Sequence, residues 1–183
     1  MSYRADIVVP CYNEEEALPE TAPVILDYFA RLVADPGNGL AGFRLILVND
    51  GSRDGTWAII AGLAERHAEV EGVMLSRNFG HQNAMLAGMS ITDADVVITM
   101  DADLQDDLGA VKDMLAAYET GADLALGVRI DRSSDSKGKK GTANAYYRLL
   151  SLLGIDIVEN HADFRLMSRV ALDALLSYRE VNL

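Results

Sequence analysis

The sequence has little cysteine, few basic residues and no long apolar run, and each shortage excludes a class of protein. Cys11 is the single cysteine among 183 residues, so no disulfide can form within the chain. The apolar runs at residues 45–48 and 96–100 fall far short of the roughly 20 residues that cross a bilayer. The first residues also lack the apolar stretch of a secretory signal. We therefore expect a cytosolic protein without a membrane span.

Basic residues are outnumbered, with 16 Lys and Arg against 28 Asp and Glu, which gives a formal net charge of −12. Because an excess of negative charge repels phosphate backbones, nucleic acid is not an expected partner. Half of the residues are apolar, and this length suits one α/β domain with a proper core but is short for two. We expect a single domain over residues 1–183, and the composition leaves the oligomeric state open.

Short β-branched runs alternate with segments of helical periodicity, which predicts an α/β fold with a mostly parallel sheet. The expected strands are residues 7–10, 43–48, 73–75, 96–100 and 124–128. Apolar residues at helical spacing predict helices around residues 24–32, 57–64 and 114–118, and we interpret these stripes as core rather than cofactor contacts. A polar segment, 129–141, then precedes two further helical stretches, 142–153 and 168–178.

Gly37, Gly39 and Gly42 spell G-x-G-x-x-G, the fingerprint of dinucleotide binding. That fingerprint works only where it follows a strand and opens a helix, because its amides must meet a pyrophosphate at the helix N-terminus. Here it follows a predicted helix and precedes a predicted strand. We interpret it as a flexible connection.

Polar clusters follow three of the predicted strands, where open α/β sheets bind their ligands. The clusters are Pro10 to Glu14, Asn49 to Asp54 and Asp101 to Gln105. Each has a local structural alternative: Asn13 as a helix cap, Asp54 with Gly55 as a turn, and Asp106 as an N-cap. Because all three clusters fall at equivalent edges of the sheet, we favour a shared ligand site.

Asp101 and Asp103 point to a divalent metal ion. Two carboxylates at positions i and i+2 can turn toward one point, where they repel unless a cation or proton lies between them. Mg²⁺ or Mn²⁺ would bind few protein oxygens and complete its shell with substrate phosphates, and Gln105 offers another oxygen. Zinc is not expected, since the three histidines and the cysteine are scattered without ligand spacing.

Five motifs resemble those of glycosyltransferase family 2 and keep its motif order and spacing over nearly the whole chain. They are PCYNEEE (10–16), NDGSRDGT (49–56), SRNFGHQNAM (76–85), DADLQD (101–106) and DFRLMSR (163–169). They are most similar to the polyprenyl-phosphate sugar transferases, meaning undecaprenyl-phosphate glucosyltransferases and dolichyl-phosphate mannose relatives. The resemblance implies a GT-A-type, Rossmann-like fold. It also implies transfer of a hexose, glucose from UDP-glucose being the first expectation, to a polyprenyl phosphate.

The resemblance further assigns roles to individual residues. It implies that the nucleotide is bound by Pro10, Tyr12, Asn13 and Glu14, and that its base and ribose are recognised by Asp50 and Ser52. It implies donor binding by Arg77 and Gly80. It also implies that Mg²⁺ or Mn²⁺ bridges the diphosphate and is bound by Asp101, Asp103 and Gln105. Asp163 matches a carboxylate near the acceptor, and Arg165 sits beside it. One departure is Asn49, where the family usually has a first acid before Gly51.

Five cations gather in the segment 129–141, opposed by Asp131 and Asp135. They are Arg129, Arg132, Lys137, Lys139 and Lys140. A run of charge is commonly a solvated face. The resemblance favours contact with the acceptor phosphate and donor diphosphate, and we assign that contact to Arg129, Arg132 and Lys140.

The implied reaction is displacement at the anomeric carbon with inversion, in which the metal neutralises charge on the departing diphosphate. A phosphate monoester has its second pKa near about 6 and is mostly ionised at neutral pH, so it hardly needs a base. Asp163 is therefore expected to orient the acceptor at least as much as it takes a proton; the sequence leaves both roles open.

Three functions remain as alternatives: an active lipid-phosphate transferase, a nucleotide-sugar-binding module without transfer, and an unrelated nucleotidyltransferase with convergent acids. A transferase of the GDP-mannose type is a variant of the first. The resembling enzymes continue into amphipathic and membrane-spanning helices, so we expect this chain to be either a soluble fragment of a longer membrane-attached protein or a naturally short version with altered acceptor handling. We expect the full-length protein to act at the cytoplasmic face of the membrane.

Overall fold

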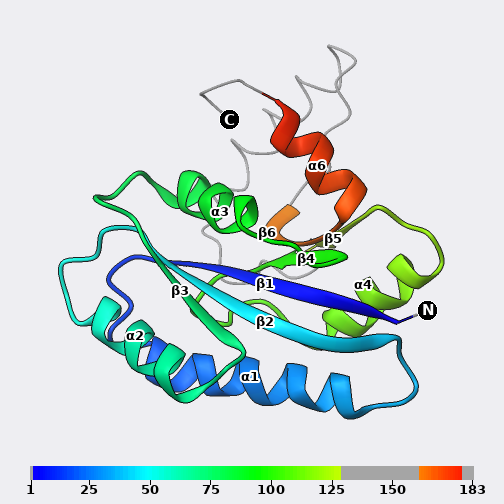
Figure 1. The fold of residues 1–183 in the computed structure, drawn as a ribbon, viewed down its shortest axis with the longest axis horizontal. Helices are drawn as coiled ribbons and strands as arrows, with labels where there is room; N and C mark the ends of the chain where they lie inside the picture. Colours follow the sequence, from blue (N-terminus) through cyan, green and yellow to red (C-terminus); the bar gives the residue numbers. More distant parts are fainter. Residues whose placement is uncertain (1, 129–160, 179–183) are drawn as a thin grey trace, which may run out of the picture.

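A computed structural model describes residues 2–128 and 161–178 of the chain. Its centre is a six-stranded sheet with the order β3-β2-β1-β4-β6-β5 (Figure 1). The strands are β1 (Tyr3–Cys11), β2 (Leu40–Asn49), β3 (Val70–Met74), β4 (Val96–Thr99), β5 (Leu124–Val128) and β6 (His161–Ser168). The first four run parallel, whereas β6 pairs antiparallel with both β4 and β5. The prediction of a mostly parallel α/β sheet is confirmed.

Helices cover both faces of the sheet. They are α1 (Leu18–Ala34), α2 (Thr56–Arg66), α3 (His81–Ser90), α4 (Ala110–Glu119) and α6 (Arg169–Ser177). The larger core cluster joins one face of the sheet to α1, α2 and α4, and the smaller joins the other face to α3 and α6. Figure 1 shows these two layers on opposite sides of the strands. None of the described helices is long and apolar enough to cross a membrane.

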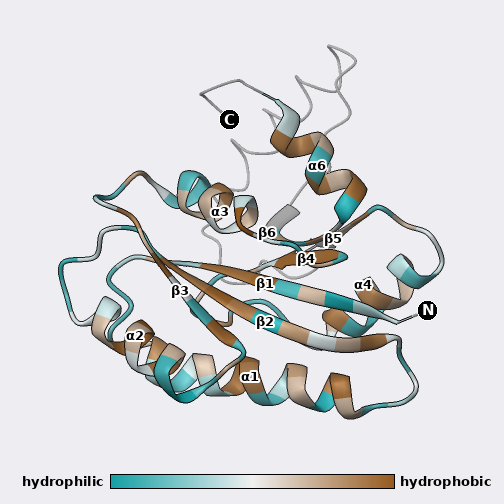
Figure 2. Ribbon diagram, viewed as in Figure 1, coloured by the Kyte–Doolittle hydropathy of each residue, from teal (hydrophilic) through white to brown (hydrophobic). Residues whose placement is uncertain are grey.

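The central strands are apolar along most of their length, as expected for strands covered on both faces. β1 reads Ile7, Val8, Val9 and β2 reads Leu45 to Val48, all fully buried. Figure 2 shows both strands as hydrophobic toward their carboxyl ends, with hydrophilic positions earlier in each strand, while the helices alternate between hydrophobic and hydrophilic positions. The parallel arrangement therefore brings the polar ends of β1, β2 and β4 to one edge of the sheet.

Gly37 and Gly39 lie in the connection between α1 and β2, so the prediction of a connection is confirmed for them, whereas Gly42 lies within β2. The predicted helix at residues 168–178 is confirmed as α6, with the Ser168 hydroxyl accepting a hydrogen bond from the amide of Ala171 at 3.1 Å. The predicted segments 129–141 and 142–153 lie outside the described residues.

Two elements escaped prediction. The prediction of five strands is wrong, because residues 161–168 form β6, inserted between β4 and β5. Helix α3 was also missed, since its small residues weaken the apolar periodicity. Gly88 explains that composition: a Cβ there would lie 2.5 Å from Val8 and 2.8 Å from Val48, so α3 approaches the sheet too closely for a larger side chain.

Candidate functional site

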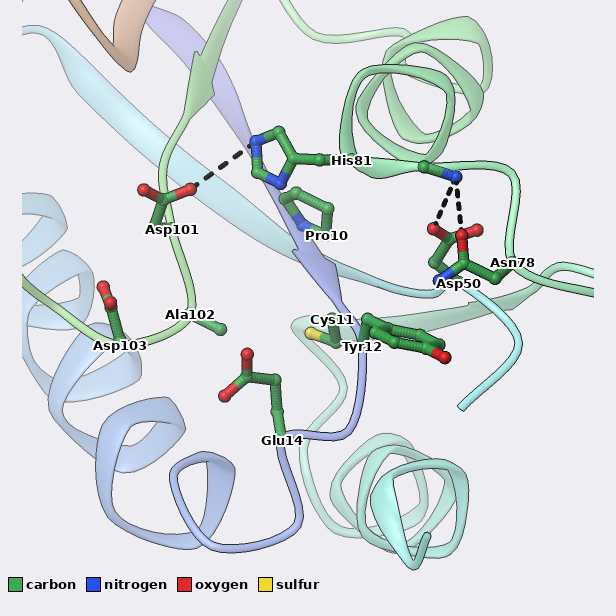
Figure 3. A pocket seen from close by; sticks show the side chains of 11 residues that line it. Pro10, Cys11, Tyr12, Glu14, Asp50, Asn78, His81, Asp101, Ala102 and Asp103 are labelled. Atoms are coloured by element: carbon green, nitrogen blue, oxygen red, sulfur yellow. Dashed lines mark hydrogen bonds and ion pairs between the residues drawn. The ribbon is translucent and has the colours of Figure 1, made fainter. Parts of the chain in front are cut away.

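A pocket of about 230 Å³ opens at the carboxyl ends of β1, β2 and β4 (Figure 3). Its lining residues are Pro10, Cys11, Tyr12, Glu14, Asp50, Asn78, Gly80, His81, Asp101, Ala102 and Asp103. They come from three strand ends, from the connection between β3 and α3, and from the start of α3 itself. The sheet topology thus unites motifs that lie up to about 90 residues apart in the sequence, where open α/β sheets commonly bind ligands.

The segments after β1 and β2 are fastened to each other. Asn13 adopts a positive φ of 58°, its amide donates to the Ser52 hydroxyl at 3.0 Å, and its side-chain oxygen accepts from the Arg53 amide at 3.0 Å. The Glu14 amide donates to the Thr56 hydroxyl at 2.8 Å. These bonds fix one wall of the pocket, and they occupy Asn13 and Ser52 as structural contacts.

Asp50 anchors the loop between β3 and α3. It is buried, and its two carboxylate oxygens accept hydrogen bonds from the amides of Phe79 at 2.7 Å and Gly80 at 2.9 Å. Gly51 follows with φ of 64°, and a Cβ there would lie 2.3 Å from the Arg77 carbonyl carbon. The loop can therefore press against β2 only because residue 51 is glycine.

Carboxylates crowd the end of β4. Burial raises the pKa of Asp101, and nearby Asp106, Asp103 and Asp163 raise it further, while His81 opposes the shift. Asp103 is exposed, and its side chain accepts a bond from the Gln105 amide at 3.1 Å. Figure 3 shows the Asp101 carboxylate turned toward His81. Burial and the neighbouring negative charges thus both disfavour the ionised form of this carboxylate.

Glu14 faces the same acidic environment from the β1 side. Its pKa is raised by burial and then by the negative charges of Asp103, Asp54 and Asp101. The described residues that line the pocket include neither lysine nor arginine. A cation with oxygen-preferring chemistry suits such a lining, because two or more carboxylates in one place are stabilised by a hard divalent ion.

A second constellation lies beside Asp101. His81 Nε2 is 3.6 Å from an oxygen of Asp101 and 3.2 Å from Asp163 Oδ2. The other oxygen of Asp163 accepts hydrogen bonds from Arg165 at 2.9 Å and Gln82 at 3.2 Å. Ligand atoms of His81, Asp101 and Asp163 lie within 4.8 Å of one another, close enough to hold one metal ion.

The structure brings many of the predicted site residues together. Seven line the pocket: Pro10, Tyr12, Glu14, Asp50, Gly80, Asp101 and Asp103. Asp163 lies beside the pocket, where it contacts the lining residue His81, and Arg165 binds Asp163. Arg77 places its guanidinium 4.0 Å from the Phe79 ring centre and, like Asn13, Ser52 and Gln105, is absent from the lining. Arg129, Arg132 and Lys140 lie outside the described residues. The binding and catalytic roles of all these residues remain predictions.

His81 is the residue that sequence reasoning missed. The sequence shows no ligand spacing around His81, because its partners Asp101 and Asp163 are 20 and 82 residues away in the chain. The motif SRNFGHQNAM was noted, but it offers no local ligand spacing. The local structural alternatives for the three polar clusters have different outcomes. Asn13 and Asp106 are not N-caps, because α1 begins after Ala17 and α4 after Gly109. Asp54 does form a turn, in which its side chain accepts a hydrogen bond from the Thr56 amide.

Sequence comparison matches the family model described as glycosyl transferase family 2 to residues 6–176. An uncharacterised glycosyltransferase of Bacillus subtilis (strain 168), YkoT, is 41% identical over 97% of this chain and 53% of its own length. A bactoprenol glucosyl transferase of Shigella phage SfX is 35% identical over 98% of this chain and 57% of its own length. The chain thus spans little more than half the length of these relatives.

Two solved structures share the fold at 18% identity. The mannosyltransferase PcManGT of Pyrobaculum calidifontis, in complex with GDP-Man and Mn²⁺, gives a TM-score of 0.61 over 96% of this chain and 47% of its own. Glucosyl-3-phosphoglycerate synthase of Mycobacterium tuberculosis, in complex with Mn²⁺, UDP and phosphoglyceric acid, gives 0.62 over 92% and 56%. The expected GT-A-type fold is confirmed.

Proposed function

The chain belongs to glycosyltransferase family 2, and from this premise we propose that it transfers glucose from UDP-glucose to a polyprenyl phosphate with the help of a divalent metal ion. The observation that carries the proposal is the group of carboxylates at the end of β4, in a pocket lined by three strand ends. The relatives supply the acceptor class, since several are named bactoprenol glucosyl transferases.

Charge is the reason for including a metal in the donor site. A nucleotide diphosphate is an anion, and Glu14, Asp50, Asp101 and Asp103 give the pocket the same sign. A divalent ion between the carboxylates and the diphosphate removes that repulsion. The donor set fits Mg²⁺ or Mn²⁺, which bind carboxylate oxygens and keep positions open for substrate phosphates. When bound, the ion stabilises negative charge on the departing diphosphate.

We assign the donor side of the site to the strand ends and the loop that they fix. Tyr12, 40% exposed, and Pro10 offer apolar surface beside the base, and Asp50 can accept a further bond while it holds the amides of Phe79 and Gly80. Asp101 and Asp103 hold the ion next to the diphosphate. The wall built by Asn13 and Ser52 keeps this arrangement in place before a ligand arrives.

Asp163 orients the acceptor in this proposal rather than taking its proton. Three side chains already face the carboxylate: Arg165 and Gln82 donate to one oxygen, and His81 lies 3.2 Å from the other. These contacts hold the carboxylate in one orientation, as a group that positions a substrate requires. The acceptor phosphate is largely ionised near neutral pH and can attack the anomeric carbon directly, with inversion of its configuration. A lipid acceptor would require this reaction to occur at a membrane surface, and we propose the cytoplasmic face.

The nucleotide sugar that serves as donor has one specific alternative to UDP-glucose. The neighbour with GDP-Man shares the fold as closely as the neighbour with UDP, so a GDP-mannose donor is the second candidate. A domain that binds the donor without transfer is the third, because the chain spans little more than half the length of its relatives. Family membership argues against an unrelated nucleotidyltransferase.

The test is a transfer assay with the purified chain, polyprenyl phosphate in detergent micelles and Mn²⁺, supplied with UDP-glucose or with GDP-mannose. Mass spectrometry of the lipid should detect hexosyl polyprenyl phosphate with UDP-glucose, and Asp103→Ala should abolish it. If product forms only with GDP-mannose, the donor is GDP-mannose and not UDP-glucose. Donor binding without any lipid product would leave a binding domain, and an unchanged rate in Asp103→Ala would contradict the metal assignment.

A further inference from the structure

His81 opens helix α3 and points its imidazole between carboxylates from two different strands. Asp101 follows β4, and Asp163 lies on β6, which is distant from β4 in the sequence. We propose that His81 is a direct ligand of the divalent ion and shares it with Asp101 and Asp163. The inference rests on the proposed function, because it concerns the ion of the same donor site.

The distances suit one ion. Metal–ligand bonds of about 2.0–2.2 Å place neighbouring ligand atoms roughly 3–3.5 Å apart and opposite ones up to about 4.4 Å apart. The distances from His81 Nε2, 3.2 Å to Asp163 and 3.6 Å to Asp101, fall close to that spacing, and all three ligand atoms lie within 4.8 Å. Small side-chain rotations would suffice to close the site.

The residues around Asp163 support this assignment. Arg165 and Gln82 both donate to Asp163 Oδ1, which leaves Oδ2 facing His81. Metal-binding carboxylates are commonly held in this way by outer hydrogen bonds that fix the orientation of the free oxygen. Gln82 follows His81 in the first turn of α3, so the same turn would supply one ligand and orient another.

The proposal changes the expected metal preference. Asp101, Asp103 and Gln105 offer only oxygens, and such a set suits Mg²⁺. An imidazole nitrogen strengthens binding of Co²⁺ far more than binding of Mg²⁺. The ion would also join Asp101 on the donor side to Asp163 on the acceptor side, so that metal binding orders both parts of the site.

The test compares the affinities of the metal-free chain for Co²⁺ and Mg²⁺ in wild type, His81→Gln and His67→Gln. His67 is the C-cap of α2 and serves as the matched histidine control. We expect His81→Gln to weaken Co²⁺ binding at least about tenfold, since even outer-shell changes cost 10–100-fold. Its Mg²⁺ affinity should change less than about threefold, and His67→Gln should match wild type in both. An unchanged Co²⁺ affinity in a folded His81→Gln chain would overturn the assignment.

A measurement without a variant covers the case in which His81→Gln does not fold. Pulsed electron paramagnetic resonance of Mn²⁺ bound to the wild-type chain should detect coupling to a nitrogen nucleus of the imidazole. Absence of nitrogen coupling overturns the ligand assignment, and the proposed function stands if Mn²⁺ still promotes UDP binding. If Mn²⁺ neither binds nor promotes UDP binding, both proposals fail.

Discussion

Two groups of carboxylates lie on the same sheet, and within the described residues an arginine contacts every carboxylate of the first group but only Asp163 of the second. In the first, Arg44 on β2 binds Asp6, Glu71 and Asp93, with donor–acceptor distances of 2.7–3.1 Å. In the second, Arg165 binds Asp163, whereas Asp101 has His81 as its partner, and the residues that line the pocket include neither lysine nor arginine.

The difference separates a structural cluster from a binding site. Asp6 is fully buried, yet both of its oxygens are bonded to the Arg44 guanidinium, so the charge is compensated within the fold. Asp101 and Glu14 instead have raised pKa values, because burial and like charges are not offset. A protein keeps such an arrangement at a cost in stability where a ligand supplies the missing charge.

The largest expected effect breaks the structural cluster. Arg44→Met should lower the free energy of unfolding by about 3 kcal/mol, because it leaves the buried Asp6 carboxylate without its partner. Urea unfolding measures the loss, and Asp6→Asn combined with Arg44→Met should recover part of it. Metal-dependent nucleotide binding should persist in the folded fraction; its disappearance would mean that the two clusters are not independent.

The next effect removes a carboxylate from the binding cluster. Asp101→Asn should weaken Mn²⁺ binding by about 100-fold, or roughly 2.7 kcal/mol, because the amide carries no charge and is a poorer ligand. Isothermal titration measures it, with Asp113→Asn on the exposed face of α4 as control. Equal Mn²⁺ affinity in the two variants would contradict the placement of the ion at β4.

A smaller effect is expected at Asp50, which belongs to the pocket but is satisfied by the backbone. Asp50→Asn replaces one acceptor oxygen by an NH₂ group, so the amide of Phe79 or Gly80 loses its bond to residue 50, although Gly80 keeps its bond to the Asn78 side-chain oxygen at 3.0 Å. We expect a loss of about 1–3 kcal/mol in unfolding free energy. Hydrogen exchange at Phe79 and Gly80 should speed up, while Mn²⁺ affinity should change little; unchanged exchange would show that the loop is held by other contacts.

The smallest effect has the opposite sign. Glu14→Gln should stabilise the metal-free protein slightly at pH 7, by at most about 1 kcal/mol, because it removes a partly buried negative charge from acidic surroundings that solvent partly screens. The pKa of Glu14 is raised in the folded state from 4.5, so wild type recovers this stability as the pH falls through the folded pKa. The advantage of the variant should therefore vanish below about pH 4.5. An advantage independent of pH would point to packing instead.

The sequence was sufficient for the parallel part of the fold because β1, β2 and β4 are apolar runs that end in polar clusters. It was insufficient for β6, whose antiparallel insertion between β4 and β5 depends on contacts distant in the chain. The polar strand ends predicted the pocket, since parallel strands bring Glu14, Asp50 and Asp101 to one edge. His81 escaped because its partners are set by that same insertion: Asp163 approaches it only through β6.

The most direct test of the central claim, that the β4 cluster needs an external cation to bind a nucleotide diphosphate, is isothermal titration of the chain with UDP and with GDP, each with and without Mn²⁺. We predict binding of UDP in the presence of Mn²⁺, none detectable in its absence, and none in Asp103→Ala. Nucleotide binding that is equally strong without a divalent ion, or that survives unchanged in Asp103→Ala, would contradict it.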